Sequence, residues 1–350
     1  MSPKKIFLLS TIVLMLACAI PPNIWGNSLV PVAPVTSVFN FTETPTMTVT
    51  PSSTPTLFPT ETPLPTLTYT PVPSLDTIER VLIISYDGMR PDAIPLAPMP
   101  NLMGLMANGA YAPTSAETID YPATSPSHAS MLSGLCMDKH GVVTNKYFAF
   151  MGYSKGVDIF DLAHAAGMRT VMIVSKDKLR QMAEPETTDV FEVRYGEPAV
   201  SREAAAQIEQ GFDLMFVHFA GPDLRGHKYG WMGDAYMQVL REGDEALGTI
   251  LAALQENGLM DTTLIIVTSD HGGHDRNHIG TIIEDFRISW IASGPGIVPG
   301  QLDFMISTTD TAVTAAYALK LPLQPDWDGI PVYAAFGQPQ VPVHEKNPCR

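Results

Sequence analysis

Cysteine is scarce in this sequence of 350 residues, in which only Cys18, Cys136 and Cys349 occur. Three thiols are too few for a disulfide-stapled scaffold or for a zinc site built from thiolates. An oxidising compartment would permit a bridge between Cys136 and Cys349, but the sequence does not decide whether it forms.

Basic residues are also few. The chain has 21 Lys and Arg against 36 Asp and Glu, so its formal net charge is −15. A protein this acidic is not expected to hold a nucleic acid duplex through its phosphates. Bound metal ions would still reverse the local field and admit a small anionic substrate.

The first 26 residues are typical of an export signal. Lys4 and Lys5 precede an apolar run, 6–20, which is shorter than a comfortable membrane span. A small residue before the lone Cys18 resembles a bacterial lipoprotein cleavage site, and we favour lipidation there. The alternatives are ordinary signal-peptidase cleavage or an uncleaved membrane anchor. We therefore expect an exported protein, extracellular or at the cell surface, with a possible tether at its N-terminus.

A linker is expected at 27–77. Its central stretch, 31–74, is dominated by Thr, Pro and Ser and contains no Lys or Arg. Proline at this density opposes helix and sheet, and too few large apolar residues are left to form a core. We expect an extended spacer, followed by a folded domain at 78–343 and a short tail at 344–350.

Apolar runs rich in β-branched residues alternate with helical spacing after residue 78. The runs predicted as buried strands are 80–88, 170–174, 212–219 and 264–267. The segments predicted as helices are 157–166, 204–210 and 234–257. This alternation predicts an α/β fold with a mainly parallel central sheet and helices on both faces.

Polar side chains gather where the apolar runs end. Asp87 ends the first run, while Asp270 and His271 follow the last and precede two glycines, which we expect to let the backbone approach a bound group. Asp223 and His227 are one helical turn apart beyond the third run, so both can reach one ion. Ligands collect at the carboxyl ends of parallel strands, and carboxylate and imidazole suit zinc.

Thr124 lies at the predicted start of another helix. Pro126 suits the first turn, and Ser125 or Thr124 would cap it. Free N–H groups at a helix N-terminus stabilise an anion. One hydroxyl, three carboxylates and three imidazoles together suit two adjacent zinc ions; they belong to Thr124, Asp87, Asp223, Asp270, His227, His271 and His278.

Four motifs carry a family resemblance when read in order. They are Tyr86-Asp87-Gly88, Thr124-Ser125-Pro126-Ser127-His128, Asp223-x-x-x-His227 and Ser269-Asp270-His271-Gly272. Across roughly 78–299 the chain resembles the alkaline phosphatase superfamily, and within it the type I phosphodiesterase/nucleotide pyrophosphatase family. The resemblance implies an alkaline-phosphatase-like fold and a zinc-dependent phosphodiesterase or nucleotide pyrophosphatase that acts on a small phosphate ester.

The resemblance also implies a role for each matching residue. Thr124 would be the nucleophile, would lie beside the first zinc and would form a phosphothreonine intermediate. The first zinc would be held by Asp87, Asp270 and His271. The second would be held by Asp223, His227 and a later histidine, for which we choose His278 over His274 and His344. We expect His128 to be structural.

The substrate is less sharply implied. Nucleotide-cleaving members carry an aromatic residue directly after the nucleophile and Asn three residues after it, where this chain has Ser125 and Ser127. Ser127 and Asn145 are the expected substrate-binding residues. A phosphomonoesterase or phosphonate hydrolase is the alternative, and a monoesterase would need a cation beside the metals, for which the candidates are Lys146, Lys155 and Arg225. An inactive, surface-tethered binding domain is a third hypothesis.

Overall fold

The computed structural model describes residues 74–350. The predicted export signal, Cys18 and nearly all of the predicted linker lie outside the described residues. Among the residues that are described, no helix has the length and apolar character needed to cross a membrane.

The described residues form one large sheet with the strand order β5-β4-β6-β1-β7-β8-β2-β9. Its strands are β1 (Arg80–Tyr86), β2 (Gly109–Ala112), β4 (Thr170–Val174), β5 (Val190–Val193), β6 (Leu214–Phe219), β7 (Thr263–Thr268), β8 (Trp290–Ser293) and β9 (Gly300–Gln301). All neighbouring pairs are parallel except those of β8, which runs antiparallel to both β7 and β2. A small parallel pair, β3 (Ala116–Glu117) and β10 (Ile306–Ser307), lies apart from it.

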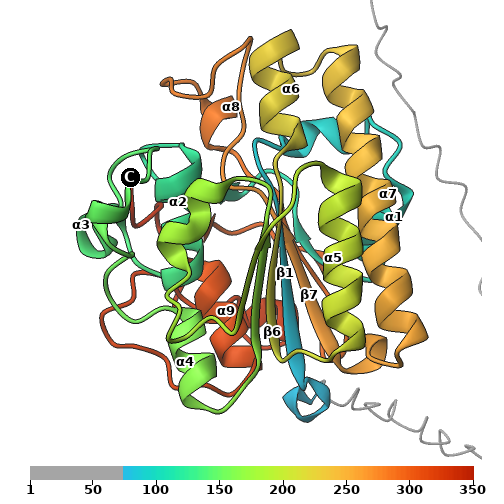
Figure 1. The fold of residues 1–350 in the computed structure, drawn as a ribbon, viewed down its shortest axis with the longest axis vertical. Helices are drawn as coiled ribbons and strands as arrows, with labels where there is room; N and C mark the ends of the chain where they lie inside the picture. The colour runs from blue at the N-terminus through green and yellow to red at the C-terminus, as the bar shows by residue number, and fades with distance from the viewer. Residues whose placement is uncertain (1–73) are drawn as a thin grey trace, which may run out of the picture. The chain divides into compact units, whose positions relative to one another are not determined.

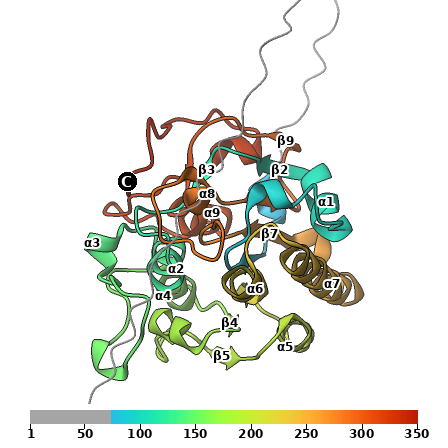
Figure 2. The ribbon, with the colours of Figure 1, turned by 90° about the horizontal axis from the view of Figure 1, so that it is seen from above.

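Helices cover both faces of this sheet (Figure 1). They are α1 (Pro100–Ala107), α2 (Thr124–Ser133), α3 (Met137–His140), α4 (Ile159–Ala165), α5 (Glu197–Glu209), α6 (Gly221–Tyr229), α7 (Asp234–Glu256), α8 (Ile283–Phe286) and α9 (Asp310–Ala318). In Figure 1, α5 and α7 lie on one side of β1 and β6, while α2, α4 and α9 lie on the other. Both views place α6 beside α7 (Figures 1 and 2). The predicted α/β class, with its mainly parallel sheet, is confirmed.

The core occupies both faces because successive side chains of a strand point to opposite sides. In β1, Val81 and Ile83 belong to the apolar cluster beneath α2, α4 and α9. Leu82 and Ile84 belong to the cluster beneath α1, α5 and α7. A strand buried on both sides needs a continuous apolar run, which explains why this one was visible in the sequence.

The predicted boundaries hold best for strands. The predicted strand 170–174 coincides with β4, and the others differ by a few residues at their ends. The predicted helix 204–210 begins earlier, because Gly196 starts α5 and Pro198 occupies its first turn, where proline is tolerated. The expected cap of α2 by Ser125 or Thr124 is wrong. Its N-cap is Ala123, which makes no side-chain cap bond, and Thr124 is the first helical residue.

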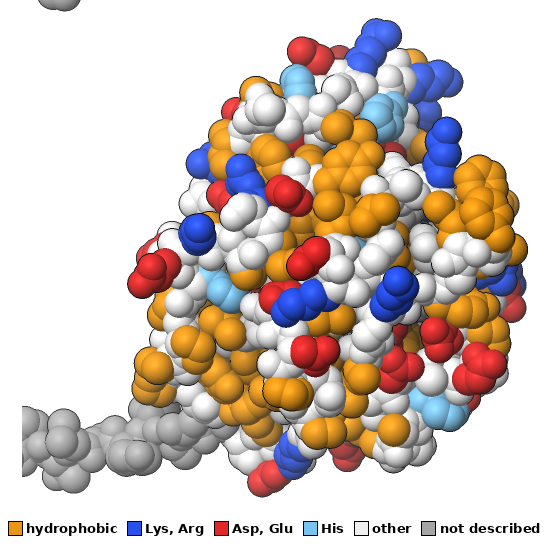
Figure 3. All heavy atoms as spheres, turned by 90° about the vertical axis from the view of Figure 1, so that its left-hand side faces the viewer, with side chains coloured by type: hydrophobic (Ala, Val, Ile, Leu, Met, Phe, Trp, Pro, Cys, Tyr) orange, Lys and Arg blue, Asp and Glu red, His pale blue; other side chains and the backbone are white. Residues whose placement is uncertain are grey.

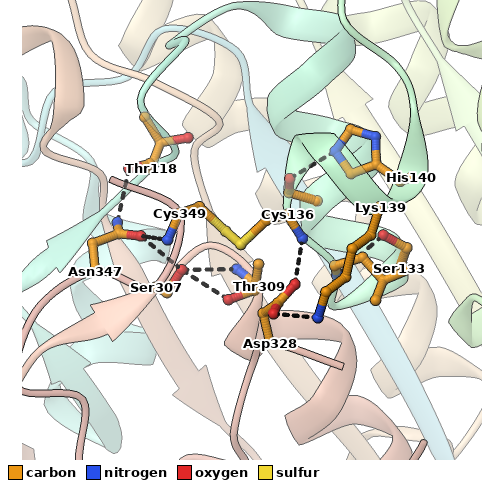
Figure 4. The surroundings of a disulfide bond; sticks show 12 residues. Thr118, Ser133, Cys136, Lys139, His140, Ser307, Thr309, Asp328, Asn347 and Cys349 are labelled. Atoms are coloured by element: carbon orange, nitrogen blue, oxygen red, sulfur yellow. Dashed lines mark hydrogen bonds and ion pairs between the residues drawn. A yellow bond between two sulfur atoms is a disulfide. The ribbon is translucent and has the colours of Figure 1, made fainter. Parts of the chain in front are cut away.

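The C-terminal residues 344–350 pack against the folded domain. Cys349 forms a disulfide with Cys136, 213 residues earlier in the chain (Figure 4). Asn347 is buried and donates to the backbone oxygen of Thr118 (2.8 Å). His344 Nε2 lies 2.8 Å from Asp310 Oδ1. The pairing that the sequence left open is therefore present.

Candidate active site

Three adjacent strands deliver the acidic residues to one edge of the sheet. Asp87 directly follows β1, Asp223 lies in the first turn of α6 just after β6, and Asp270 follows β7 by two residues. Because β6, β1 and β7 are neighbours and parallel, their carboxyl ends meet. The backbone N–H of Asp223 donates to the carbonyl oxygen of Asp87 (2.9 Å), which joins the first two directly.

The first cluster comprises Asp87, Asp270 and His271, and one ligand atom of each lies within 4.8 Å of the others. His271 Nε2 is 3.5 Å from Asp87 Oδ1 and 3.4 Å from Asp270 Oδ2. All three side chains are fully buried. Two ligands that each lie about 2 Å from a tetrahedral zinc are about 3.3 Å apart, so these separations suit a shared ion.

The second cluster comprises Asp223, His271 and His278, again within 4.8 Å of one another. His278 Nε2 is 3.7 Å from Asp223 Oδ1, and the rings of His271 and His278 stack at 3.8 Å between centroids. His227 joins from α6, with Nε2 3.3 Å from Asp223 Oδ1. The structure thus brings all six predicted metal ligands together, with His271 between the two groups.

The three imidazoles share one hydrogen-bonding pattern. Their Nδ1 atoms donate to backbone carbonyl oxygens, those of Arg276 (from His227, 3.0 Å), Gly272 (from His271, 2.8 Å) and Pro122 (from His278, 2.6 Å). A carbonyl oxygen only accepts, so each Nδ1 carries a proton and each ring turns its Nε2 toward the carboxylates. Burial, followed by the nearby His271, lowers the pKa of His278 to about 3, which keeps that ring neutral. The hydrogen bond with Asp223 instead raises the pKa of His227. Fixing a ring through its second nitrogen is how proteins orient histidine ligands to metals.

The carboxylates have a matching pattern, in which one oxygen of each is bonded and the other is bare. Asp270 Oδ1 accepts from the N–H groups of Gly88 and His271 (3.0 Å each), and Asp87 Oδ2 accepts from His218 (2.9 Å). Asp87 Oδ1, Asp223 Oδ1, Asp270 Oδ2 and His271 Nε2 are buried without a hydrogen-bond partner in residues 74–350. Bare acceptors in a buried site are costly unless a cation binds them. The residues present therefore fit a metal centre.

The two glycines after His271 have a different role from the one expected. A Cβ on Gly272 would lie 1.9 Å from the backbone oxygen of Glu284, and one on Gly273 would lie 2.3 Å from the Trp231 ring. These glycines therefore allow close packing against the protein itself rather than against a bound group. Gly88 has φ +72°, and its Cβ would lie 3.1 Å from the Asp223 Cα.

Thr124 is buried at the start of α2, and its Oγ1 lies 3.2 Å from Lys176 Nζ. The same ammonium contacts Asp87 Oδ2 (2.7 Å) and Asp223 Oδ2 (2.6 Å). Burial by itself would lower the pKa of Lys176, but the two carboxylates outweigh it and raise that pKa above its ordinary value. Lys176 is therefore a fixed positive charge beside the predicted nucleophile.

Burial by itself would raise the pKa of Asp87, but the charge of Lys176 and the hydrogen bond from His218 hold it well below its ordinary value. The pKa of Asp270 is raised by burial and by the charge of Asp87, because it has no lysine partner of its own. One cation therefore offsets only part of the negative charge collected here.

The two predicted substrate-binding residues lie in different surroundings. Asn145 Oδ1 accepts from the Ser125 N–H (3.0 Å) and from Lys178 Nζ (2.7 Å), so its amide lies beside the start of α2. Its Nδ2 makes no hydrogen bond within the described part of the chain. Ser127 is fully buried, and its Oγ accepts from the Thr118 hydroxyl (3.1 Å).

Sequence reasoning missed Lys176, Lys178 and His218. Lys176 follows β4 by two residues, at the same sheet edge as the acidic residues. A search for lysines, as well as acids and histidines, at the ends of the predicted strands would therefore have found it. His218 lies within β6 itself; it accepts from the Ser175 N–H (3.2 Å) and donates to Asp87. The lysine candidates named from the sequence, Lys146 and Lys155, are exposed on their loop.

Three of the histidines outside the two clusters have partners of their own. His274 Nδ1 is 2.7 Å from Asp285 Oδ1, and His344 is paired with Asp310. His128, expected to be structural, is fully buried and donates to the Thr124 carbonyl oxygen (2.7 Å) while accepting from the Ser85 hydroxyl (2.8 Å). It thus ties α2 to β1 behind the site.

The parallel sheet with a ligand cluster at its strand ends is an alkaline-phosphatase-like α/β arrangement. Residues 81–298 match the sequence profile described as type I phosphodiesterase/nucleotide pyrophosphatase. The chain belongs to this family.

Similar proteins agree with this placement. A bis(5′-adenosyl)-triphosphatase of Mus musculus is 25% identical over 214 aligned positions, and the match covers 55% of this chain and 47% of that protein. The ectonucleotide pyrophosphatase/phosphodiesterase family member 7 of Homo sapiens is 25% identical over 218 residues, again 55% and 47%. The chain thus spans about half the length of these relatives.

Solved structures of a murine ectonucleotide pyrophosphatase/phosphodiesterase share the fold. One has a TM-score of 0.60 at 16% identity and covers 74% of this chain and 99% of its own. A second, described as an inactive threonine-to-alanine variant in complex with AMP, has a TM-score of 0.59 at 16% identity and covers 73% and 98%.

Proposed function

We propose that this chain hydrolyses phosphoric esters by means of two zinc ions and a covalent intermediate on Thr124. One observation carries the proposal: imidazoles anchored through Nδ1 turn Nε2 toward half-bonded carboxylates beside Thr124, and four of these buried atoms have no hydrogen-bond partner in residues 74–350. Bare acceptors in a buried site are costly unless cations bind them. Asp87, Asp270 and His271 would hold one zinc, and Asp223, His227 and His278 the other. Bound zinc supplies Lewis acidity and lowers the pKa of oxygen ligands.

The chain's own residues would carry a two-step transfer. Thr124 Oγ1 attacks phosphorus, its proton passes to solvent, and the bond from phosphorus to the leaving alcohol breaks as the new Thr124 Oγ1–phosphorus bond forms. The alcohol takes a proton from water. In the second step a water oxygen attacks phosphorus from the side opposite Thr124, which regains its hydroxyl proton. Lys176 Nζ, 3.2 Å from Thr124 Oγ1, would offset the charge that develops there.

The murine relative supports both the nucleophile and the substrate class, since it was solved with AMP as an inactive threonine-to-alanine variant. We therefore propose a small phosphate ester as substrate. We further propose an exported protein with a signal at 1–26, a linker at 27–77, a catalytic domain at 78–343 and a C-terminal segment at 344–350. The Cys136–Cys349 disulfide supports export, because such bonds persist in oxidising compartments. Lipidation at Cys18 belongs to this proposal.

The test uses the full chain, loaded with zinc, and measures hydrolysis of 4-nitrophenyl phosphate and bis(4-nitrophenyl) phosphate. We expect turnover that a chelator abolishes and zinc restores, with two bound zinc equivalents by elemental analysis. His278→Ala should retain fewer than two, whereas the exposed His164→Ala should match the wild type. Hydrolysis of neither ester, or full activity without metal, would refute the proposal.

A further inference from the structure

Two lysines approach the site from one short segment. Lys176 precedes, and Lys178 lies within, the short 3-10 helix Asp177–Met182 that follows β4. Lys176 is held against Thr124, Asp87 and Asp223, and Lys178 Nζ is held by Asn145. The intervening Asp177 points the other way, its carboxylate 59% exposed and paired with Arg180 (2.9 Å). The alternation places both ammonium groups on the side of the nucleophile.

Lys176 is compatible with bound metal because it uses atoms that the metals would not. It contacts Oδ2 of Asp87 and Oδ2 of Asp223, whereas the bare atoms that face the histidines are the Oδ1 atoms. Its side chain is only 14% exposed, so its charge is poorly screened by water. Lys178 contacts none of the carboxylates and is held through the Asn145 amide instead.

The charge balance separates two classes of ester. Three carboxylates against two divalent ions leave one positive charge in excess, which is enough for the monoanion of a diester. The two lysines raise that excess to three, which suits the dianion that a phosphate monoester carries near neutral pH. This excess is local, because the chain as a whole has a net charge of −15 and the face in Figure 3 mixes acidic, basic and apolar side chains.

The hydrogen-bond donors near the start of α2 also favour a phosphate monoester over a diester. A monoester presents three terminal oxygens, whereas a diester presents two and carries an organic group in place of the third. Lys178 and the unbonded Nδ2 of Asn145 supply donors near the start of α2 in addition to the metals. Lys176 contributes its charge there, because its three N–H donors already face Asp87, Asp223 and Thr124. An organic group placed against a half-buried ammonium would strip its water without replacing the lost hydrogen bonds.

We propose that Lys176 and Lys178, positioned with Asn145, make this site selective for the dianionic phosphoryl group of phosphate monoesters. The inference rests on the proposed hydrolase function and decides between its ester classes. In a family described by its diesterase and pyrophosphatase activities, this chain would therefore act on terminal phosphates.

The experiment compares kcat/KM for 4-nitrophenyl phosphate and bis(4-nitrophenyl) phosphate in the zinc-loaded full chain and in Lys178→Gln, Lys176→Gln and the exposed control Lys146→Gln. The wild type should prefer the monoester. Because a charge-assisted hydrogen bond is lost, Lys178→Gln should lower the monoester-to-diester ratio about 10- to 100-fold. Lys146→Gln should leave the ratio unchanged. Calorimetric titration with inorganic phosphate should show weaker binding to Lys178→Gln by a similar factor, at unchanged zinc content.

The outcomes separate the inference from the function on which it rests. A wild type that prefers the diester, or a Lys178→Gln variant that loses both activities equally, would overturn the inference while leaving the hydrolase intact. If neither ester is hydrolysed, the proposed function fails, and phosphate affinity then decides the role of the lysines. Phosphate binding that is unchanged in both lysine variants would overturn the inference in that case as well.

Discussion

The two ends of α2 have opposite surroundings, although every residue of the helix is buried. At the N-terminal end, Thr124 faces Lys176 and a group of carboxylate and imidazole atoms without partners. At the C-terminal end, polar groups are bonded: Ser133 Oγ donates to the Ala129 oxygen (2.6 Å), and Ser130 Oγ lies 2.9 Å from His140 Nε2.

The C-terminal end is also fastened to distant parts of the chain (Figure 4). The Cys136 N–H donates to Asp328 Oδ2 (2.8 Å), and Lys139 pairs with the same carboxylate (2.5 Å). The disulfide between Cys136 and Cys349 also joins this region to the C-terminal segment of the chain. Burying unsatisfied groups costs stability. The contacts at the C-terminal end can offset the stability that is lost by burying unsatisfied groups at the N-terminal end. We therefore expect substitutions at the N-terminal end to lower kcat and substitutions at the C-terminal end to lower stability.

The largest expected effect is that of Thr124→Ala. Loss of the nucleophile should lower kcat by at least about 10⁴-fold, since covalent catalysis has no substitute oxygen at this position. Zinc content and thermal stability should change little, because the hydroxyl makes only the contact with Lys176 in residues 74–350. Steady-state kinetics, elemental analysis and thermal denaturation measure the three quantities.

The matched control lies at the other end of the same helix. Ser133→Ala removes a hydroxyl that donates to the Ala129 oxygen and accepts from the Leu135 N–H (3.3 Å), so it should cost about 1 to 2 kcal/mol of stability and leave kcat unchanged. Turnover near the wild-type rate in Thr124→Ala would show that the nucleophile assignment is mistaken.

The disulfide should give the largest effect on stability. Cys349→Ser opens a covalent loop of 213 residues, and chain entropy predicts a loss of about 5 kcal/mol in the free energy of unfolding. kcat at a temperature where the variant stays folded should match the wild type. Urea denaturation measures the loss, with reduced wild type as the control. A variant of full stability but reduced kcat would mean that the two ends of α2 are coupled.

The contrast between the ends also explains what the sequence could reveal. The proposed ligands Asp87, Asp270 and His271 were visible because each follows a strand buried on both faces, whose apolar run is continuous. Lys176 also follows a predicted strand, but its proposed role and that of Lys178 depend on β4 lying beside β6 in the sheet. The position after a strand is visible in the sequence, whereas the contact with Asp87 and Asp223 is not, and a lysine after a strand is ordinarily a solvated residue.

The rest of the fold also divides into features that a local sequence pattern predicts and features that depend on tertiary contacts. Four parallel strands, β1, β4, β6 and β7, were recognised from their composition, whereas the parallel β5 and the antiparallel β8, each only four residues long, were not. Gly272 and Gly273 were identified correctly as special, but their neighbours Glu284 and Trp231 come from distant segments that only the fold brings near. The polar residues at strand ends can thus be predicted from one sequence, whereas the residues that contact them are known only once the fold is known.

The last expected effect concerns His140, which follows α2 and is fully buried. Val142 N–H donates to its Nδ1 (3.1 Å), so the ring is neutral with its proton on Nε2. Burial lowers the pKa of His140 to about 4 from an ordinary value of 6.5. Between pH 4 and 6.5 the unfolded chain therefore binds the additional proton. The stability contributed by neutral His140 is complete above pH 6.5 and is lost progressively as the pH falls from 6.5 to 4, by about 3 kcal/mol in all.

The contribution of His140 can be isolated by comparing wild type with His140→Gln. Urea denaturation at several pH values gives the pH slope of the unfolding free energy for each protein. The wild type should lose more stability than the variant between pH 6.5 and 4, because Gln has no proton to gain. Other groups titrate equally in both proteins and cancel in the difference. Equal slopes would mean that His140 takes up its proton in the folded state as readily as in the unfolded chain. The C-terminal end of α2 would then contain an ion rather than a neutral hydrogen-bonded ring, and its contrast with the catalytic end would be weaker.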